Sequence, residues 1–183
     1  MKLKNNHLLL ILLAIAAIIA AVFLLNNKNE SVSFPYKELS FTATEITSIN
    51  IMPSFDSKKA FKIIQKREKW YIESKALNAK VDSNVIETTL AEIEKIRPDH
   101  FVTDQPEKWK DYGVDSSGTL VTISDQKGKK TTLIVGNMTF IDDIYVSSYI
   151  RLSEKNEVYA TECYLEGTLK KDINEWTKKS GNQ

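Results

Sequence analysis

A continuous apolar run over residues 8–25 is the strongest feature of the hydrophobic pattern, and it contains no charged residue. A helix of about 18 residues at 1.5 Å per residue measures roughly 27 Å, close to the thickness of a bilayer's hydrocarbon core. Lys2 and Lys4 precede the run. Because basic residues favour the cytoplasmic side, the pattern predicts a cytoplasmic tail over residues 1–7 and a transmembrane anchor over residues 8–25, with the bulk of the chain extracytoplasmic.

A cleaved secretory signal peptide is the alternative interpretation of this run. Its apolar core is usually about 7 to 15 residues long and ends at a small-residue cleavage site. Here the small residues lie inside the run, as at Ala14 and Ala20, and no cysteine follows it closely. We therefore favour an uncleaved anchor, and the mass of the mature protein would show whether the run is lost.

Residues 26–40 are polar without periodicity, which suits a short stalk, and residues 41–179 predict a single domain. Apolar and polar positions alternate along several stretches of this domain, as in half-buried strands. The stretches are 45–52, 60–66, 70–73, 120–125, 131–135, 144–151 and 157–161. Short turns separate the second stretch from the third and the fourth from the fifth, which predicts two hairpins.

Between these hairpins the spacing of the apolar residues changes to that of a helix. Asp82 is a suitable N-cap, Pro98 forces an end, and the apolar residues between them have helical spacing: Ile86, Leu90, Ile93 and Ile96. A further helical turn is predicted over residues 107–112, closed by Gly113, and a short terminal helix around Trp176 and Ile173. The predicted fold class is α+β, with a mainly antiparallel sheet built from hairpins, one main helix and a short C-terminal helix, preceded by one transmembrane helix.

Charge argues against a nucleic-acid partner. Two of the 25 basic residues, Lys2 and Lys4, precede the run, so 23 basic residues face 24 acidic ones beyond it. A nucleic-acid-binding domain needs a basic surplus or stripe, and the sequence pattern indicates neither. Glu68 and Glu73 are interspersed with the basic residues of the first hairpin. We therefore interpret those residues as a solvated strand surface rather than a lipid-binding patch: Lys58, Lys59, Lys62, Lys66, Arg67 and Lys69.

No motif predicts a catalytic residue, a cofactor or a metal site. The six glycines are scattered and form no phosphate-binding loop. The exported part has one cysteine, Cys163, and one histidine, His100, which are too few for a zinc site and lack a nucleophile motif. Cys163 suits a buried small residue. An envelope hydrolase that uses paired carboxylates is the least favoured alternative. Its candidate residues are expected to have turn and capping roles instead: Asp111, Asp115, Asp142 and Asp143.

Tyr145, Tyr149 and Arg151 alternate with apolar residues and are therefore expected on one strand face. A row of aromatic and basic side chains is able to stack on a sugar or to hold a partner peptide. Packing beneath a covering helix, with the phenol oxygens bonded at its rim, is the interpretation that we favour. These three residues are the sequence's candidates for a partner or ligand surface.

Several segments in the second half of the chain resemble a known family. They are Tyr112-Gly113-Val114-Asp115, Val121-Thr122-Ile123, Leu133-Ile134-Val135-Gly136, Tyr145-Val146 and Val158-Tyr159. Together with Ile46–Ile49, Trp70–Ile72 and the helix from Asp82, they resemble the bacterial domain-of-unknown-function family 4340. Ser116 and Ser117 stand where that family tends to have proline. The resemblance marks four residues as structural motif positions and supplies no catalytic residue: Tyr112, Gly113, Asp115 and Gly136.

Members of this family are typically membrane-tethered and often encoded beside gliding-motility-type ABC transporter genes. The resemblance therefore implies a single-pass protein of the bacterial cytoplasmic membrane. Its domain would be an extracytoplasmic accessory or interaction domain of an ABC-type transport complex, with a permease or related membrane protein as partner. The competing hypothesis is a small-ligand or glycan-binding domain that uses the tyrosine-bearing sheet face, and a thermal shift with candidate ligands would separate the two.

Overall fold

A computed structural model describes residues 39–177 of the chain, apart from 75–77, 142–144 and 170. The chain divides into two compact units, residues 1–34 and 35–183. The whole first unit, and with it the predicted tail and anchor, lies outside the described residues, as does the stalk up to residue 38. Within the described part, none of the helices combines the length and the apolar character that crossing a bilayer requires.

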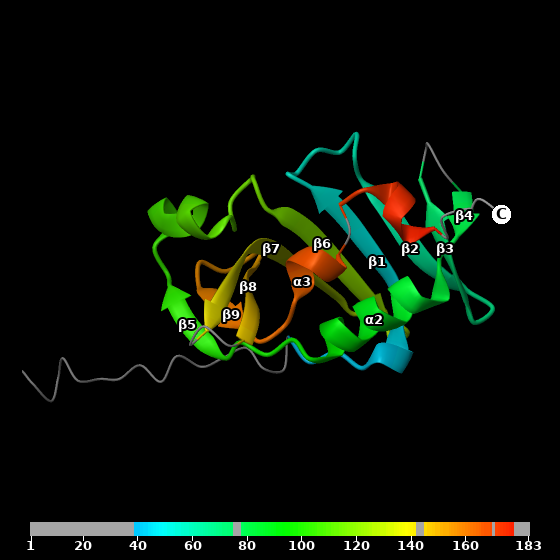
Figure 1. Ribbon diagram of the computed structural model, residues 1–183, viewed down its shortest axis with the longest axis horizontal. Helices are drawn as coiled ribbons and strands as arrows, with labels where there is room; N and C mark the ends of the chain where they lie inside the picture. Colours follow the sequence, from blue (N-terminus) through cyan, green and yellow to red (C-terminus); the bar gives the residue numbers. More distant parts are fainter. Residues whose placement is uncertain (1–38, 75–77, 142–144, 170, 178–183) are drawn as a thin grey trace, which may run out of the picture. The chain divides into compact units, whose positions relative to one another are not determined.

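The described residues form one nine-stranded sheet in the order β4-β3-β2-β1-β6-β7-β8-β9-β5, and every pairing is antiparallel (Figure 1). This confirms the predicted α+β class with a mainly antiparallel sheet. The strands are β1 (Ile46–Pro53), β2 (Phe61–Lys66), β3 (Lys69–Glu73), β4 (Asn78–Lys80), β5 (His100–Thr103), β6 (Thr119–Asp125), β7 (Lys130–Ile141), β8 (Tyr145–Leu152) and β9 (Val158–Thr161).

Each predicted strand is present, and the predicted hairpins are β2–β3 and β6–β7. The first turn is shorter than expected, because Lys69 begins β3 and only Arg67 and Glu68 remain in it. Both residues are left-handed, with φ of 48° and 64°, as a two-residue hairpin turn requires. The pattern missed β4, β5 and the helix α3 (Leu165–Thr168), because elements of three or four residues are too short to show a period.

The helices predicted within the domain are also confirmed. The main helix is α2 (Ser83–Glu94), which ends before Pro98, and its N-cap Asp82 accepts a 2.9 Å hydrogen bond from the Asn84 amide. The expected turn over 107–112 is the 3-10 helix η2 (Pro106–Tyr112), closed by left-handed Gly113 at φ 66°. Two further 3-10 helices flank the domain, η1 (Ala43–Glu45) near its start and the predicted terminal element η3 (Ile173–Trp176).

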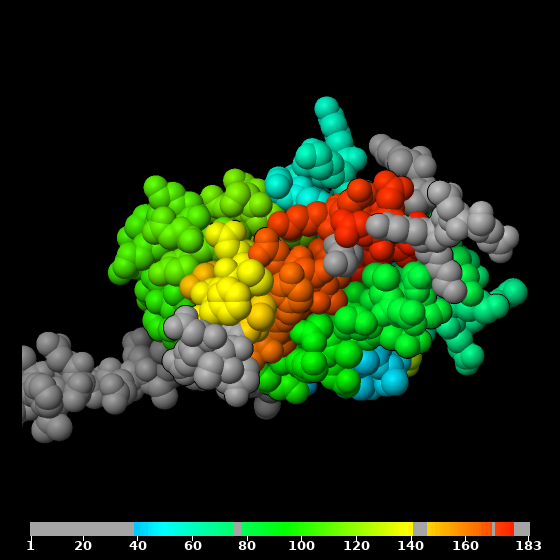
Figure 2. Space-filling model, viewed as in Figure 1, coloured from blue at the N-terminus to red at the C-terminus, as the bar shows by residue number. Residues whose placement is uncertain are grey.

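The core lies on one face of the sheet, which we call the helix-covered face. Strand register places four isoleucines in a row across β3, β2, β1 and β6, all at most 2 % exposed: Ile72, Ile63, Ile49 and Ile123. Their β-branched side chains fill the pleated surface well. In Figure 1, α2 and α3 lie in front of these strands, and in Figure 2 they hide much of the sheet.

Three contacts hold the helical layer together. The Thr89 hydroxyl of α2 donates to the Thr168 carbonyl of α3 at 3.4 Å. The Asp82 amide donates to the Trp176 carbonyl at 2.8 Å, so the start of α2 meets the end of η3. The Trp176 ring is fully buried and meets Phe61 of β2 edge-on, with centroids 6.3 Å apart. Trp176 therefore joins the C-terminal segment to the sheet.

The opposite face of the sheet is covered over only part of its width. Over β7, β8 and β9 it packs against η2 and Val114, through a cluster with Ile134 and Val158 that Trp109 borders. Over β1 to β4 the residues of this face are exposed or half-buried, apart from the 8 % exposed Ser48. We call the part over β1–β4 and the adjoining ends of β6 and β7 the open face.

Replacing Trp176 with alanine is expected to destabilise the domain by about 3–5 kcal/mol, because the change removes a fully buried aromatic side chain and leaves a cavity. The measurement is urea unfolding followed by circular dichroism. Glu175→Ala, an exposed change in the same short helix, is the control and should stay within about 0.5 kcal/mol of the parent. Equal unfolding midpoints for the two variants would show that η3 does not anchor the fold.

Candidate functional site

The four family-motif residues meet where the end of η2 crosses strand β7. The Tyr112 carbonyl oxygen lies so close to Gly136 of β7 that a Cβ there would clash with it. Gly113 takes the left-handed conformation that turns the chain at this point, and it packs beside Asn137. Any side chain at Gly136 would force the two backbones apart. The glycine is therefore required by close approach of backbone to backbone.

Asp115 holds the turn that follows. One of its carboxylate oxygens accepts from the Ser117 hydroxyl at 2.5 Å and from the Ser117 amide at 3.0 Å. These two hydrogen bonds lower the pKa of Asp115, because they favour the charged carboxylate. Ser117, which stands in the stretch where the family tends to have proline, thus stabilises the turn by hydrogen bonding.

Arg151 is the most unusual residue of the predicted tyrosine–arginine face, since it is a charged side chain only 5 % exposed. Its guanidinium lies 3.6 Å from the centre of the Trp109 ring. It donates to the Val114 carbonyl from two nitrogens at 3.2 Å each and to the Lys155 carbonyl at 2.8 Å. Burial lowers its pKa from the ordinary arginine value. Arg151 is therefore engaged in holding η2 and the turn after β8 against the sheet.

Tyr149 is also engaged in packing and hydrogen bonding within the domain. Its ring meets that of Tyr112 edge-on, with centroids 4.8 Å apart, and its hydroxyl donates to the Thr139 hydroxyl at 3.3 Å. Tyr145 begins β8, but its side chain lies outside the described part of the structure. The structure thus brings Tyr149 and Arg151 together beneath η2 and among packing partners, and the binding role of this face stays a prediction.

The residues considered for chemistry are dispersed. Cys163 is 1 % exposed, and burial raises the pKa of its thiol to about 11, so the reactive thiolate is scarce at neutral pH. His100 is exposed on the edge strand β5. Asp111 is exposed at the end of η2, and Asp142 and Asp143 lie outside the described residues. Among the described side chains, no three of His, Cys, Asp or Glu are placed to hold a metal ion.

Four large apolar side chains are exposed near one another on the helix-covered face, and we call them the apolar patch. They are Met138 at 39 %, Phe140 at 55 %, Val146 at 36 % and Tyr164 at 47 % exposed. Phe140 and Val146 are directly opposite each other on β7 and β8. Glu166 of α3 accepts from the Met138 amide at 2.7 Å, which brings the helix beside the strands. Figure 2 shows the β8 residues, in yellow, at the surface beside the orange residues of α3.

A cavity of about 790 Å³ opens beside the loop of residues 54–60, a volume typical of small-molecule sites. Ser54 and Phe55 in this loop are left-handed, with φ of 48° and 52°, a conformation that costs energy for residues other than glycine. The Ser54 amide and hydroxyl donate to the carbonyls of Gly118 and Ser117, which fix the loop to the start of β6. Three lysines and three serines line the cavity together with one carboxylate: Lys58, Lys59, Lys171, Ser54, Ser57, Ser74 and Asp172.

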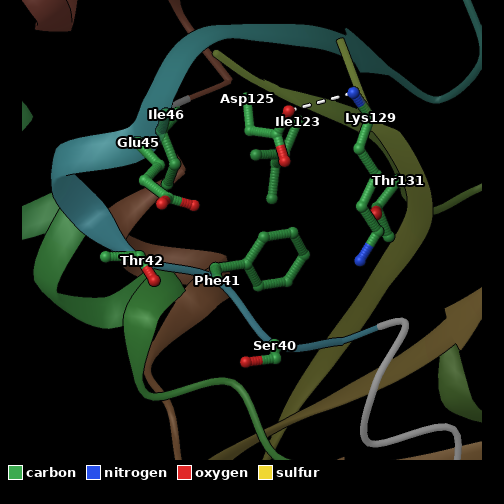
Figure 3. Close-up of a pocket in the computed structure, with 9 residues that line it drawn as sticks. All are labelled: Ser40, Phe41, Thr42, Glu45, Ile46, Ile123, Asp125, Lys129 and Thr131. Carbon is green, nitrogen blue, oxygen red and sulfur yellow. Dashed lines mark hydrogen bonds between the residues drawn. The ribbon is translucent and has the colours of Figure 1, made fainter. Parts of the chain in front are cut away.

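A second pocket lies where the described chain begins, between Phe41 and the β6–β7 turn (Figure 3). Its volume is about 30 Å³, the space of a single water molecule. The turn beside it is closed by Asp125, whose carboxylate accepts from the Lys129 amide at 2.9 Å. This pocket is therefore a packing gap and not a ligand site.

The family model for a domain of unknown function, DUF4340, matches residues 70–181, which include all four motif residues and the apolar patch. The chain belongs to this family. No curated protein and no solved structure matches the chain. The DUF4340 match begins within β3, so β1 and β2, with the resemblance at Ile46–Ile49, precede the matched residues.

Sequence reasoning missed both exposed features of this DUF4340 domain. The predicted strand ended at residue 135, whereas β7 continues past an irregularity between Val135 and Met138. The alternation of Met138 and Phe140 was a signal for this extension. The cavity brings Lys171 to Lys58 and Lys59 from more than a hundred residues away in the sequence, and no local pattern contains that pairing.

Replacing Arg151 with methionine is expected to destabilise the domain by about 2–4 kcal/mol, because buried carbonyls lose their charged donors. Arg151→Lys should not restore stability, since an ammonium group lacks the planar fork that bonds several carbonyls and stacks on Trp109. Urea unfolding followed by circular dichroism checks stability. Lys108→Met on η2 is the control. If Arg151→Met unfolds at the same urea concentration as the parent, Arg151 has a role other than packing.

Proposed function

We propose that the chain is a single-pass membrane protein whose extracytoplasmic domain docks on a membrane-protein partner, an ABC permease or a related component. Two features of the sequence support the membrane part: the uncharged apolar run over residues 8–25 and the lysines before it. Membership of a family that the sequence resemblance connects with ABC transporter genes supports the choice of partner.

The apolar patch is the observation that carries the docking part of this proposal. Single exposed apolar residues are common on soluble domains, but a group of them marks an interaction surface. Phe140 and Val146 face each other across two paired strands, and Met138 extends the same row. Aromatic residues and methionine are enriched at the centres of protein interfaces. This composition fits a protein partner better than a small polar ligand.

The surroundings of the patch indicate the chemistry of the partner. The Glu92 carboxylate accepts from the Tyr164 amide at 2.9 Å, and Glu166 bonds the Met138 amide. Glu162 is exposed beside them. Glu92 is also paired with Lys95 at 2.7 Å, and Glu166 with Lys171 at 3.5 Å, so the rim of the patch carries both signs of charge. Electrostatic complementarity therefore calls for a partner surface with an apolar centre and a rim of mixed charge.

The alternative function, a small-ligand-binding domain, is supported by the cavity beside loop 54–60 rather than by the tyrosine-bearing face. Its lining has three lysines and the carboxylate of Asp172, and two of the lysines also meet carboxylates outside the lining, Lys59 with Asp56 at 3.9 Å and Lys171 with Glu166 at 3.5 Å. Lysine and serine side chains donate hydrogen bonds, which suits a ligand with anionic groups such as a phosphorylated or carboxylated sugar.

The docking proposal predicts that a photoreactive phenylalanine analogue at position 140 of the full chain crosslinks a membrane protein in native membranes. The matched control is the same analogue at Phe101, which is 43 % exposed on the edge strand β5. Affinity purification and mass spectrometry identify the adduct. A permease adduct at position 140 and none at position 101 is expected. No adduct at either position, or identical adducts at both, would contradict docking through the patch.

The ligand-binding alternative predicts that inorganic phosphate and glucose 6-phosphate raise the melting temperature of the full chain in detergent, since a ligand that binds only the native state stabilises it. The double variant K58A/K171A should lose this shift, and K108A/K110A, with the same change of charge, should keep it. An equal shift in both variants would assign the effect to general salt stabilisation.

A further inference from the structure

Lysines gather on the open face of the sheet. Strand register places five of them there, all exposed: Lys62, Lys66, Lys69, Lys80 and Lys130. Lys80 and Lys130 come from parts of the chain distant from the first hairpin, so the sequence pattern of that hairpin contains only part of the group. We call this set the lysine face.

Acidic residues are scarce on the lysine face. Strands β1, β2, β4 and β7 contain no Asp or Glu, and β3 contributes only Glu73, which lies 3.4 Å from Lys66. Among the described residues, no carboxylate lies within ion-pair distance of Lys62, Lys69, Lys80 or Lys130. The exported part of the chain is close to neutral, so this local excess means that charge is segregated within the domain.

The arrangement of the lysines carries an electrostatic cost. Lys66 and Lys69 are directly opposite each other in the β2–β3 pair, and like charges at such positions destabilise a sheet. A polyanionic surface lying over the face would remove this repulsion. The centre of the face is Tyr71 opposite Ile64, both half-buried. Tyrosine and aliphatic groups at the centre of a basic surface suit the interfacial zone of a bilayer.

We propose that the lysine face docks on the anionic lipid headgroups of the membrane to which the chain is tethered. The inference rests on the proposed membrane anchor. Residues 26–38, which join the apolar run to the first described residue, reach at most about 45 Å when extended. A tether of this length keeps the face at an effective concentration of roughly millimolar at the bilayer, so weak attraction by several lysines suffices.

The test uses the full chain reconstituted in lipid nanodiscs, either all phosphatidylcholine or with about 30 % phosphatidylglycerol, a strongly anionic surface. Lysine acetylation by a water-soluble reagent is measured by mass spectrometry at Lys62, Lys69 and Lys80. Acetylation of these lysines should slow at least roughly threefold in anionic discs, and the protection should vanish at about 0.5 M salt, where screening shortens the range of attraction. Lys59, Lys95 and Lys171, which are exposed on the side of α2, α3 and η3, should react equally in both discs.

Two triple Lys→Glu variants provide the matched comparison. K62E/K69E/K80E should abolish the protection of Lys66 and Lys130 in anionic discs, whereas K59E/K95E/K171E on the opposite side of the sheet, with the same change in net charge, should leave it intact. Equal acetylation of the lysine face in both kinds of disc, or protection that survives high salt, would overturn the inference. Circular dichroism of both variants establishes that the fold is kept.

Co-migration of the chain with the discs separates this inference from the proposed anchor. If the chain stays with neutral discs but its lysines are not protected from acetylation in anionic ones, the anchor proposal stands and the lysine-face inference is overturned. Chain that leaves neutral discs but stays with anionic ones overturns the anchor and supports the face as the membrane contact. Chain that binds neither kind of disc overturns both.

Discussion

The buried guanidinium of Arg151 is the interaction on which one half of the sheet depends. An arginine that is 5 % exposed needs acceptors for its donors. The backbone carbonyls of Val114, Leu152, Ser153 and Lys155 accept from it, and Trp109 is stacked on the charge. These partners fix η2 across β7, β8 and β9. Once η2 is held there, its end crosses β7 so closely that Gly136 must lack a side chain. The family motif around Tyr112 is thus explained by packing rather than by chemistry.

The same interaction determines which surfaces remain available. Where η2 covers the sheet, the aromatic residues Tyr149 and Tyr112 are used for packing. Over β1 to β4 no described segment plays the role of η2, and the sheet presents lysines to solvent. On the other face, the helical cover ends at α3, and the apolar patch lies beside it. Each candidate surface therefore lies where a covering segment stops.

Local pattern was sufficient for most of the fold, because period-two and helical spacings are properties of consecutive residues. The N-cap Asp82, the left-handed Gly113 and the hairpin turns follow from the conformations that these residues favour. The short strands β4 and β5 had no such signal, because their positions depend on pairing with distant strands. The candidate surfaces were harder still to predict from the sequence. The lysine face needs Lys80 and Lys130 on the same face of the sheet as Lys62, and only strand order and register place these three there.

The lysine face and the apolar patch lie on opposite faces of one sheet. Phe140 and Val146 share the face of Ser148, whose hydroxyl accepts from the Leu165 amide of α3, whereas Lys62 shares the face of Asn50, away from the helices. Occupation of one surface therefore leaves the other free. A domain that rests on lipid through its lysines would present the patch away from the bilayer. The partner that meets the patch would then need a folded extracytoplasmic portion, because transmembrane helices alone would not reach that side of the domain.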